Sequence, residues 1–262
     1  MESQNGRDRT ARILDDSLDT IPAVAPDVRT ADTLEETSRL VAEELVRLVS
    51  DRLREDEDAR LTIALAGGRT PRALYRLLAT EFRDRMPWDQ LHVFWGDERY
   101  VHRDDPRSNY RMARETLLDH VPIPAAQIHP MSTDFSRPPE AAEAYADVLR
   151  DVFGQSDPQF DVILLGLGSD GHTASLFPQS PALREQAQPV LAVMAPVPPP
   201  ARLTLTLPVL TRTHHVFVLL EGADKIAALD RVLAPGADPD RYPAAGLIRG
   251  QGRLIWWVAR MP

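Results

Sequence analysis

The residues most able to do chemistry lie in the segment Gly166–Pro178, where one histidine follows an Asp-Gly pair. An imidazole has an ordinary pKa of about 6.5, so a neutral His172 ring can take a proton from water at physiological pH. Asp170, two residues earlier, could orient or polarise that ring. The pattern predicts a general base, and the alternative is a structural histidine hydrogen-bonded only within its own loop.

The same segment also restricts the possible reactions. Its first six residues match the G-x-G-x-x-G pattern of dinucleotide-binding proteins, but Pro178 would break the helix that such a loop requires. Ser169 and Ser175 lack the glycines two positions before and after that a serine hydrolase elbow needs. We expect direct attack by water, with a dehydrogenase as a weaker alternative.

A second segment could hold an anion. Gly67, Gly68, Arg69 and Thr70 follow an apolar run and precede a helix that we expect to start at Pro71. Glycine N–H groups and a helix N-terminus can bind phosphate, and Thr70 could cap the helix or donate its hydroxyl. A tight strand-to-helix turn explains the same residues equally well.

Polar residues also follow the next apolar run, which ends at Trp95. Asp97 and Arg99 could orient sugar hydroxyls or neighbouring cations, and Asn109 lies at the start of the following helix. Glu98, considered alone, is expected to lie in a solvated turn closed by ion pairs.

Two further cations lie near ends of predicted sheet elements, where they could reach a phosphate. Arg202 begins an alternating run after the rigid loop predicted at Pro196–Pro200, and Lys225 is the single lysine among 30 Lys and Arg residues. The alternatives are an edge-strand charge for Arg202 and chance retention of a helix-face lysine for Lys225.

The composition excludes several classes of protein. With a formal net charge of -9 and no cysteine, the 262-residue chain lacks the basic balance of a nucleic-acid-binding protein and cannot form disulfides. It has no run of about 20 apolar residues that could cross a membrane and no secretory signal. The pair His214 and His215 lacks metal-ligand spacing. We expect a cytoplasmic protein without a metal.

Apolar runs alternate with segments of helical spacing along the chain. The expected strands are Leu61–Ala66, Leu91–Trp95, Phe160–Gly166, Val216–Leu220 and Leu254–Ala259, with a short one before residue 30. The expected helices are one capped by Thr33, followed by Pro71–Phe82, Ser108–His120, Pro138–Phe153 and Ala223–Ala234. This order predicts a single-domain, Rossmann-like α/β fold over residues 21–262, in which helices flank both faces of a mostly parallel sheet, after a mobile lead-in of residues 1–20. Ligands bind at the carboxyl ends of such strands.

Together these loops resemble the 6-phosphogluconolactonase family from Leu61 to the C-terminus. The resemblance rests on Ala66–Pro71, Trp95–Arg99 with Ser108–Tyr110, Gly166–Pro178, Arg202–Thr204 and Gly222–Lys225. It implies hydrolysis of 6-phospho-D-glucono-1,5-lactone without a cofactor, by a monomer or weak dimer, with His172 as the general base. It also implies supporting roles at the phosphate, the sugar ring or the base for Gly67, Gly68, Thr70, Asp97, Arg99, Asn109, Asp170, Arg202 and Lys225. Arg69 replaces the small polar residue common in that family, which leaves its role at the phosphate open.

Two other functions remain possible at this point. Glucosamine-6-phosphate deaminases or isomerases are similar in fold and share the Asp-Gly-His turn, but they need a further acid or base after the histidine, and Ala174–Phe177 offers none. A non-catalytic sugar-phosphate-binding domain would bind the same ligand without turnover.

Overall fold

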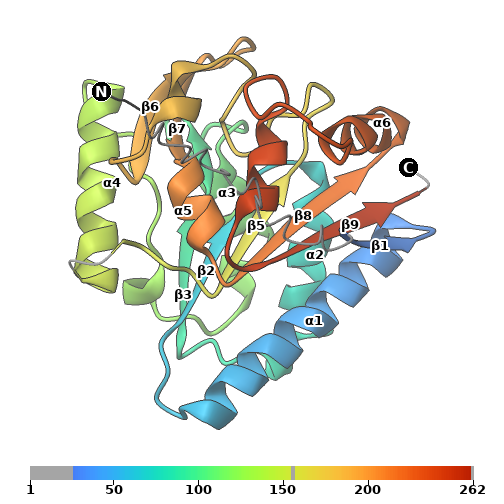
Figure 1. Ribbon diagram of the computed structural model, residues 1–262. Coiled ribbons are helices and arrows are strands. Elements are labelled where there is room, and N and C mark those ends of the chain that lie inside the picture. The colour runs from blue at the N-terminus through green and yellow to red at the C-terminus, as the bar shows by residue number, and fades with distance from the viewer. Residues whose placement is uncertain (1–25, 155–156, 261–262) are drawn as a thin grey trace, which may run out of the picture.

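The computed structural model describes residues 26–154 and 157–260, so the expected lead-in of residues 1–20 lies outside the described part. Six parallel strands form the main sheet (Figure 1). In spatial order they are β1 (Asp27–Ala31), β9 (Arg253–Ala259), β8 (His215–Glu221), β5 (Val162–Gly166), β2 (Leu61–Leu65) and β3 (Leu91–Trp95). The prediction of a mostly parallel α/β sheet is confirmed.

The strands form here because their apolar residues are buried on both faces of the sheet. All five residues of β2 are buried, as are Val162 to Leu165 of β5. β-branched and large aliphatic side chains suit such a doubly covered parallel sheet. Most buried apolar residues of the described chain belong to one continuous core.

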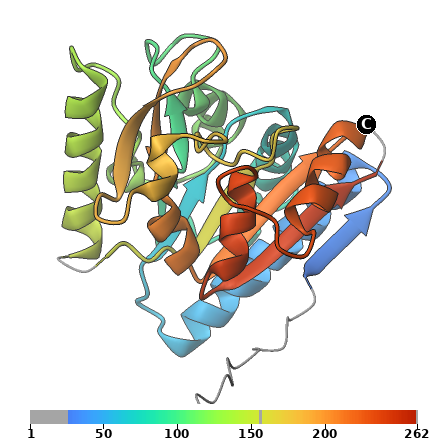
Figure 2. The same ribbon diagram turned by 45° about the horizontal axis from the view of Figure 1, so that its top comes forward.

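Helices cover both faces of this sheet. In Figure 1, α1 (Leu34–Glu55) and α2 (Arg69–Ala79) lie behind the sheet, while α5 (Leu207–Arg212) and the 3-10 helix η5 (Pro243–Arg249) lie in front of it; Figure 2 shows the same layers from a second direction. α1 contacts β1 and β9, α2 contacts β5 and β8, and the two helices pack against each other, so both lie on one face.

The ends of several helices follow the signals in the sequence. Thr33 caps α1 by accepting a hydrogen bond from the Glu36 N–H at 3.1 Å. α4 spans Pro138–Phe153, as predicted, and is followed by Gly154, whose φ of 76° is positive. The remaining helices are α3 (Asn109–Thr116), α6 (Ala223–Val232), η1 (Arg83–Arg85), η2 (Leu118–His120), η3 (Ala125–Gln127) and η4 (Pro181–Arg184).

Several predicted helix bounds are wrong: α2 ends at Ala79 rather than Phe82, and α6 ends at Val232 rather than Ala234. α2 begins at Arg69 rather than Pro71, because Gly68, with φ of 103°, already turns the chain into the helix. The predicted helix Ser108–His120 is α3, which ends at Thr116, followed by the separate turn η2. No helix of residues 26–154 or 157–260 is both long and apolar enough to cross a membrane.

A second sheet, which the sequence analysis did not predict, stands beside the first. Its strands are antiparallel in the order β4 (Asp97–Arg99), β7 (Ala201–Leu205) and β6 (Val190–Met194), and α4 packs against β6 and β7 (Figure 1). The predicted rigid loop Pro196–Pro200 joins β6 to β7. Residues 97–99, interpreted from sequence as a loop, therefore form a strand paired with residues 202–204.

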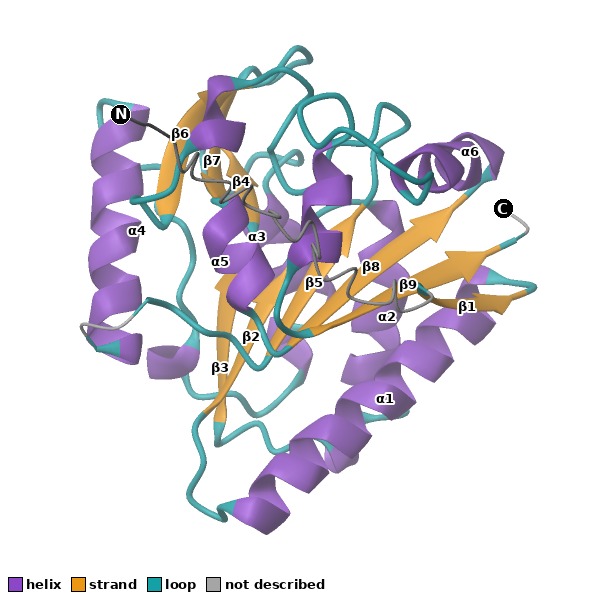
Figure 3. Cartoon of the chain, in the orientation of Figure 1, coloured by secondary structure: helices purple, strands orange, loops and turns teal. Residues whose placement is uncertain are grey.

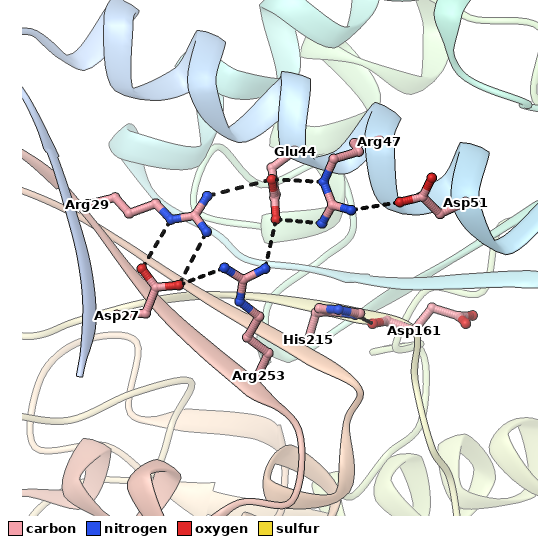
Figure 4. Close-up of polar contacts among 8 residues, drawn as sticks. All are labelled: Asp27, Arg29, Glu44, Arg47, Asp51, Asp161, His215 and Arg253. Atoms are coloured by element: carbon pink, nitrogen blue, oxygen red, sulfur yellow. Dashed lines mark hydrogen bonds and ion pairs between the residues drawn. The ribbon is translucent and has the colours of Figure 1, made fainter. Parts of the chain in front are cut away.

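The amino end of the main sheet carries a network of ion pairs that links β1, α1 and β9 (Figure 4). We call it the amino-end cluster, and its members are Asp27, Arg29, Glu44, Arg47, Asp51 and Arg253. Arg253 joins two acids, with Nη2 2.9 Å from Asp27 and Nη1 3.3 Å from Glu44. Each charge in this cluster has at least one partner of opposite sign.

Candidate active site

The predicted functional loops meet at the carboxyl edge of the main sheet. β5 lies between β2 and β8, and β3 lies beyond β2, so the loops that follow these four strands are neighbours. Figure 3 shows the loops gathered beyond the arrowheads of the strands. Because parallel strands end at the same edge, segments distant in sequence contribute to one site.

His172 follows β5 and is held by a neighbouring carboxylate. Its Nδ1 lies 2.6 Å from Asp170 Oδ1, and its backbone N–H donates to the same oxygen at 3.1 Å. This contact assigns the proton to Nδ1 and leaves Nε2 as the acceptor. Burial raises the pKa of Asp170, but the hydrogen bonds from His172 outweigh it and leave that pKa below its usual value. With 31% of the His172 side chain exposed, a small molecule can reach the ring.

The shape of the loop depends on two glycines. A Cβ on Gly168 would lie 2.1 Å from His172 Nδ1, and Gly171 has a φ of 86°. The Phe177 ring packs beside the imidazole, with ring centroids 4.5 Å apart. Residues 167–180 run as turns and bends, so this segment lacks the helix that a dinucleotide-binding loop would open.

Asp97 joins the loop of the histidine to the loop after β3. Its Oδ2 accepts a hydrogen bond from Ser175 Oγ at 2.8 Å, and its Oδ1 accepts one from Asn109 Nδ2 at 3.1 Å. Asn109 in turn fills the space beside Gly67, where a Cβ would lie 1.8 Å from Asn109 Oδ1. Asp97 and Asn109 are both buried, and their contacts with other loops support a positioning role.

Glu98 is buried, although the sequence analysis placed it in a solvated turn. It is 2% exposed and accepts hydrogen bonds from the backbone N–H groups of Arg99, Asn109 and Tyr110, each at 2.7 Å, and from Ser108 Oγ at 3.1 Å. The prediction of a solvated turn is wrong because β4 carries this residue into the protein. Burial raises the pKa of Glu98 to about 7, although the three N–H groups oppose that shift.

Two arginines come together through the second sheet. Arg99 of β4 lies opposite Arg202 of β7. Arg202 is 6% exposed and donates from Nε to the Pro199 carbonyl at 2.7 Å, so the alternative of an edge-strand charge is wrong. Burial lowers the pKa of Arg202, and Arg99 lowers it further, while Asp97 and Glu98 act in the opposite direction. Among the described residues, neither arginine forms an ion pair with a carboxylate, and Arg99 Nε is buried without a hydrogen-bond partner.

The other predicted cations lie at the N-termini of α2 and α6. Gly68 precedes the first turn of α2, which has neither an acidic residue nor a side-chain cap, and Thr70 is a buried second helical residue that does not cap it. Arg69 is exposed. Burial lowers the pKa of Lys225 in the first turn of α6, Asp224 opposes this, and Arg69 adds to it. An uncapped helix N-terminus with nearby cations favours an anion.

Sequence reasoning missed several residues of this edge. Ser175 was considered only as a nucleophile, and no role was predicted for Phe177, Thr204 or Glu221. Thr204 Oγ1 of β7 accepts the Ser175 N–H at 3.2 Å, which links the histidine loop to the second sheet. Only the position of Ser175 within the histidine loop could have suggested its role.

No group of three or more His, Cys, Asp or Glu side chains in residues 26–154 and 157–260 is placed to hold a metal ion.

The fold and this edge define a class of protein. An imidazole oriented by a carboxylate, two arginines that form no ion pair within the described chain, and a helix N-terminus without a side-chain cap are typical of an α/β enzyme that uses acid–base chemistry on a phosphorylated small molecule. Known proteins point to a particular family within that class. The family of glucosamine-6-phosphate isomerases/6-phosphogluconolactonase matches residues 32–256, and the chain belongs to it.

Individual relatives are similar over most of the chain. A 6-phosphogluconolactonase of Synechocystis sp. is 50% identical over 198 residues, or 74% of this chain and 80% of that protein. One of Mycobacterium tuberculosis is 44% identical over 205 residues, or 76% of this chain and 82% of that protein.

The fold is similar to solved structures of the same family. The 6-phosphogluconolactonase structure from Trypanosoma brucei has a TM-score of 0.78 at 32% identity and covers 89% of this chain and 96% of that one. The structure from Thermotoga maritima has a TM-score of 0.76 at 30% identity, covering 90% of this chain and all of that one.

Proposed function

We propose that this chain hydrolyses 6-phospho-D-glucono-1,5-lactone to 6-phospho-D-gluconate. The observation that carries the proposal is the contact between His172 Nδ1 and Asp170 Oδ1 at the carboxyl edge of the sheet. It leaves a basic Nε2 directed away from Asp170, and relatives that are similar over about three quarters of the chain are named 6-phosphogluconolactonases.

His172 acts on water rather than on the sugar directly. Nε2 removes a proton as the water oxygen bonds to the lactone carbonyl carbon, and Asp170 stabilises the imidazolium that forms. The carbonyl oxygen becomes an oxyanion, which N–H groups of the loop or the guanidinium of Arg202 can stabilise. When the carbonyl is restored, the ring C–O bond breaks and the proton on His172 passes to the leaving ring oxygen.

The phosphate end of the substrate is held away from the reacting carbon. Gly67, Gly68 and Thr70 offer the N-terminus of α2, and Lys225 offers its ammonium group from α6. Fixing the phosphate places the carbonyl beside the water, which lowers the entropic cost of reaction. Asp97 and Asn109 act by joining the loops, while Arg99 and Arg202 supply positive charge.

A glucosamine-6-phosphate deaminase or isomerase is the alternative within the family. Moving protons between carbons needs a further acid or base near the sugar, and the residues directly after His172 and Thr173 are Ala174, Ser175, Leu176 and Phe177. Release of ammonia from glucosamine 6-phosphate by the purified protein would favour this alternative. A non-catalytic sugar-phosphate-binding domain would bind the lactone without accelerating its opening.

The test is a pH-stat assay with freshly generated lactone. His172→Ala should lower kcat by about 10² to 10⁴ while KM changes little, because the base acts in the transition state and the phosphate contacts remain. His214→Ala is the matched control, since this exposed histidine lies at the opposite end of the sheet and should leave both constants unchanged. Equal rates for the parent chain and His172→Ala would end the general-base proposal.

The expected cytoplasmic location, the absence of a cofactor and the monomeric or weakly dimeric state stay predictions. Measuring lactone hydrolysis by the metal-free protein in chelator, together with sedimentation of the same sample, would test the last two.

A further inference from the structure

A buried carboxylate lies at the phosphate end of the proposed site. Glu221 is the last residue of β8, directly before α6, and is 6% exposed. Its Oε2 is buried and has no hydrogen-bond partner among the described residues. Since a buried charge without a partner is unfavourable, this oxygen needs a nearby cation.

The cation comes from a different helix. Arg69 Nη2 lies 3.6 Å from Glu221 Oε2, which is close enough for an ion pair but too long for a good hydrogen bond. Arg69 belongs to the first turn of α2, which follows β2, whereas Glu221 ends β8. Because β5 lies between these strands, the pair spans the end of β5, the strand that leads to the histidine loop.

The two partners differ greatly in exposure. The side chain of Arg69 is 82% exposed, whereas that of Glu221 is 6% exposed. A long exposed arginine samples many rotamers, and a ligand that must immobilise it loses affinity. An ion pair to a fixed, buried carboxylate restricts those rotamers before a ligand arrives, and the long separation leaves guanidinium N–H groups able to donate elsewhere.

Lys225 completes the arrangement from α6. Both Arg69 and Glu221 are near enough to influence its pKa, in opposite directions, in addition to the effects of burial and Asp224. Arg69, in the first turn of α2, contacts this buried carboxylate, and Lys225 follows it by four residues in the first turn of α6. Such an arrangement suits a phosphate dianion, which two cations can neutralise.

We propose that Glu221 is a positioning residue that holds the guanidinium of Arg69 over the phosphate subsite, so that Arg69 and Lys225 contact the phosphate from two helices. The inference rests on the proposed function, which places the phosphate between these helices. The proposal gives Arg69 a role at the phosphate, which the resemblance to the family left open because Arg69 replaces a small polar residue there.

The negative charge of Glu221 and its proposed positioning role predict opposite effects on phosphate affinity. Considered as a charge alone, Glu221 repels a phosphate, so its removal would tighten binding. Considered as a positioning residue, its removal frees Arg69 and weakens binding. The direction of the change in affinity therefore separates the two roles.

The experiment is a double-mutant cycle with Arg69→Ala, Glu221→Gln and the double variant. Two quantities are measured: KM and kcat for the lactone, and the Kd of inorganic phosphate by calorimetry. Either single change should raise both KM and Kd about 3- to 10-fold, the cost of ordering one long side chain, with kcat unchanged. The double variant should be no weaker than Arg69→Ala, because Glu221 acts through Arg69.

Asp224→Asn is the matched control. It removes a carboxylate from the same first turn of α6, also one that influences Lys225, but Asp224 is exposed and forms no ion pair with Arg69 within the described chain. This variant should leave KM and Kd unchanged or lower them.

Several results would overturn the proposal. They are unchanged or tighter phosphate binding in Glu221→Gln, additive effects in the double variant, or normal KM and Kd in Arg69→Ala. The last variant changes an exposed side chain, so the test stands even where Glu221→Gln folds poorly. If the parent chain failed to hydrolyse the lactone, the proposed function would fail, while the phosphate titrations would still decide the role of Glu221.

Discussion

The two ends of the parallel sheet use charge in opposite ways. At the amino end, the six residues of the amino-end cluster pair with one another across β1, α1 and β9 (Figure 4). At the carboxyl edge, Arg99, Arg202 and Lys225 form no ion pair with a carboxylate in residues 26–154 and 157–260, and buried polar atoms of Arg99 and Glu221 lack hydrogen-bond partners.

The paired charges at the amino end contribute to stability, whereas the unpaired cations at the carboxyl edge serve the proposed function. Paired charges at the amino end satisfy one another and need no ligand. Cations and helix N-termini that the fold leaves unpaired keep their attraction for an anion, at some expense in folding free energy. We therefore expect changes at the carboxyl edge to affect turnover and changes at the amino end to affect stability.

The largest expected contrast compares two aspartates, one at each end. Asp170→Ala removes the acceptor that orients the His172 ring, so kcat should fall about 10²- to 10³-fold in the pH-stat assay. The free energy of unfolding should change little, because the Asp170 side chain is 44% exposed.

Asp161→Ala provides the other half of this contrast. Asp161 Oδ2 accepts the N–H and the hydroxyl of Thr62, at 2.8 and 2.7 Å, at the amino end of β2. Its loss should reduce the free energy of unfolding by about 1–3 kcal/mol in urea and leave kcat unchanged. A normal kcat in Asp170→Ala would break the contrast.

A second contrast concerns how stability changes with pH. The pKa of Glu98 rises from 4.5 to about 7 on folding, mainly by burial. Between these values the folded chain holds a proton that the unfolded chain has lost, so this contribution to stability declines as pH rises through that window, by up to about 3 kcal/mol.

Glu44 at the amino end responds in the opposite direction. The hydrogen bond from Arg47 is the main cause that lowers the pKa of Glu44, so its contribution is present above 4.5 and is lost as pH falls below that value. Urea unfolding from pH 3 to 8 should show that Glu98→Gln flattens the decline between pH 4.5 and 7 and that Glu44→Gln does not. Parallel curves for the parent chain and Glu98→Gln would contradict the assignment.

The smallest effect is expected at the surface of the amino-end cluster. Arg253→Gln removes ion pairs to Asp27 and Glu44, but the Arg253 side chain is 44% exposed and solvent screens its charge. The free energy of unfolding should fall by only about 0.5–1 kcal/mol, and by less in 1 M salt. kcat/KM should not change; a large loss of activity would show that the two ends are coupled.

Much of the main sheet could be predicted because its signals are local. Apolar runs marked β2, β3, β5, β8 and β9, and Thr33 and Gly154 marked helix ends. The second sheet could not be predicted in the same way. β4 is only three residues long and entirely polar, and it becomes a strand because residues 202–204 pair with it from about 100 positions away.

Some features of the candidate site also follow from local sequence, whereas others depend on long-range packing. The order Asp-Gly-His at 170–172 places a carboxylate within reach of the imidazole, since residues two apart in a tight turn are close to each other. Long-range packing alone decided that Glu98 is buried, that Arg202 lies opposite Arg99, and that Glu221 faces Arg69. Such contacts depend on which strands become neighbours, and that is settled by the burial of the whole core rather than by any short stretch of the chain.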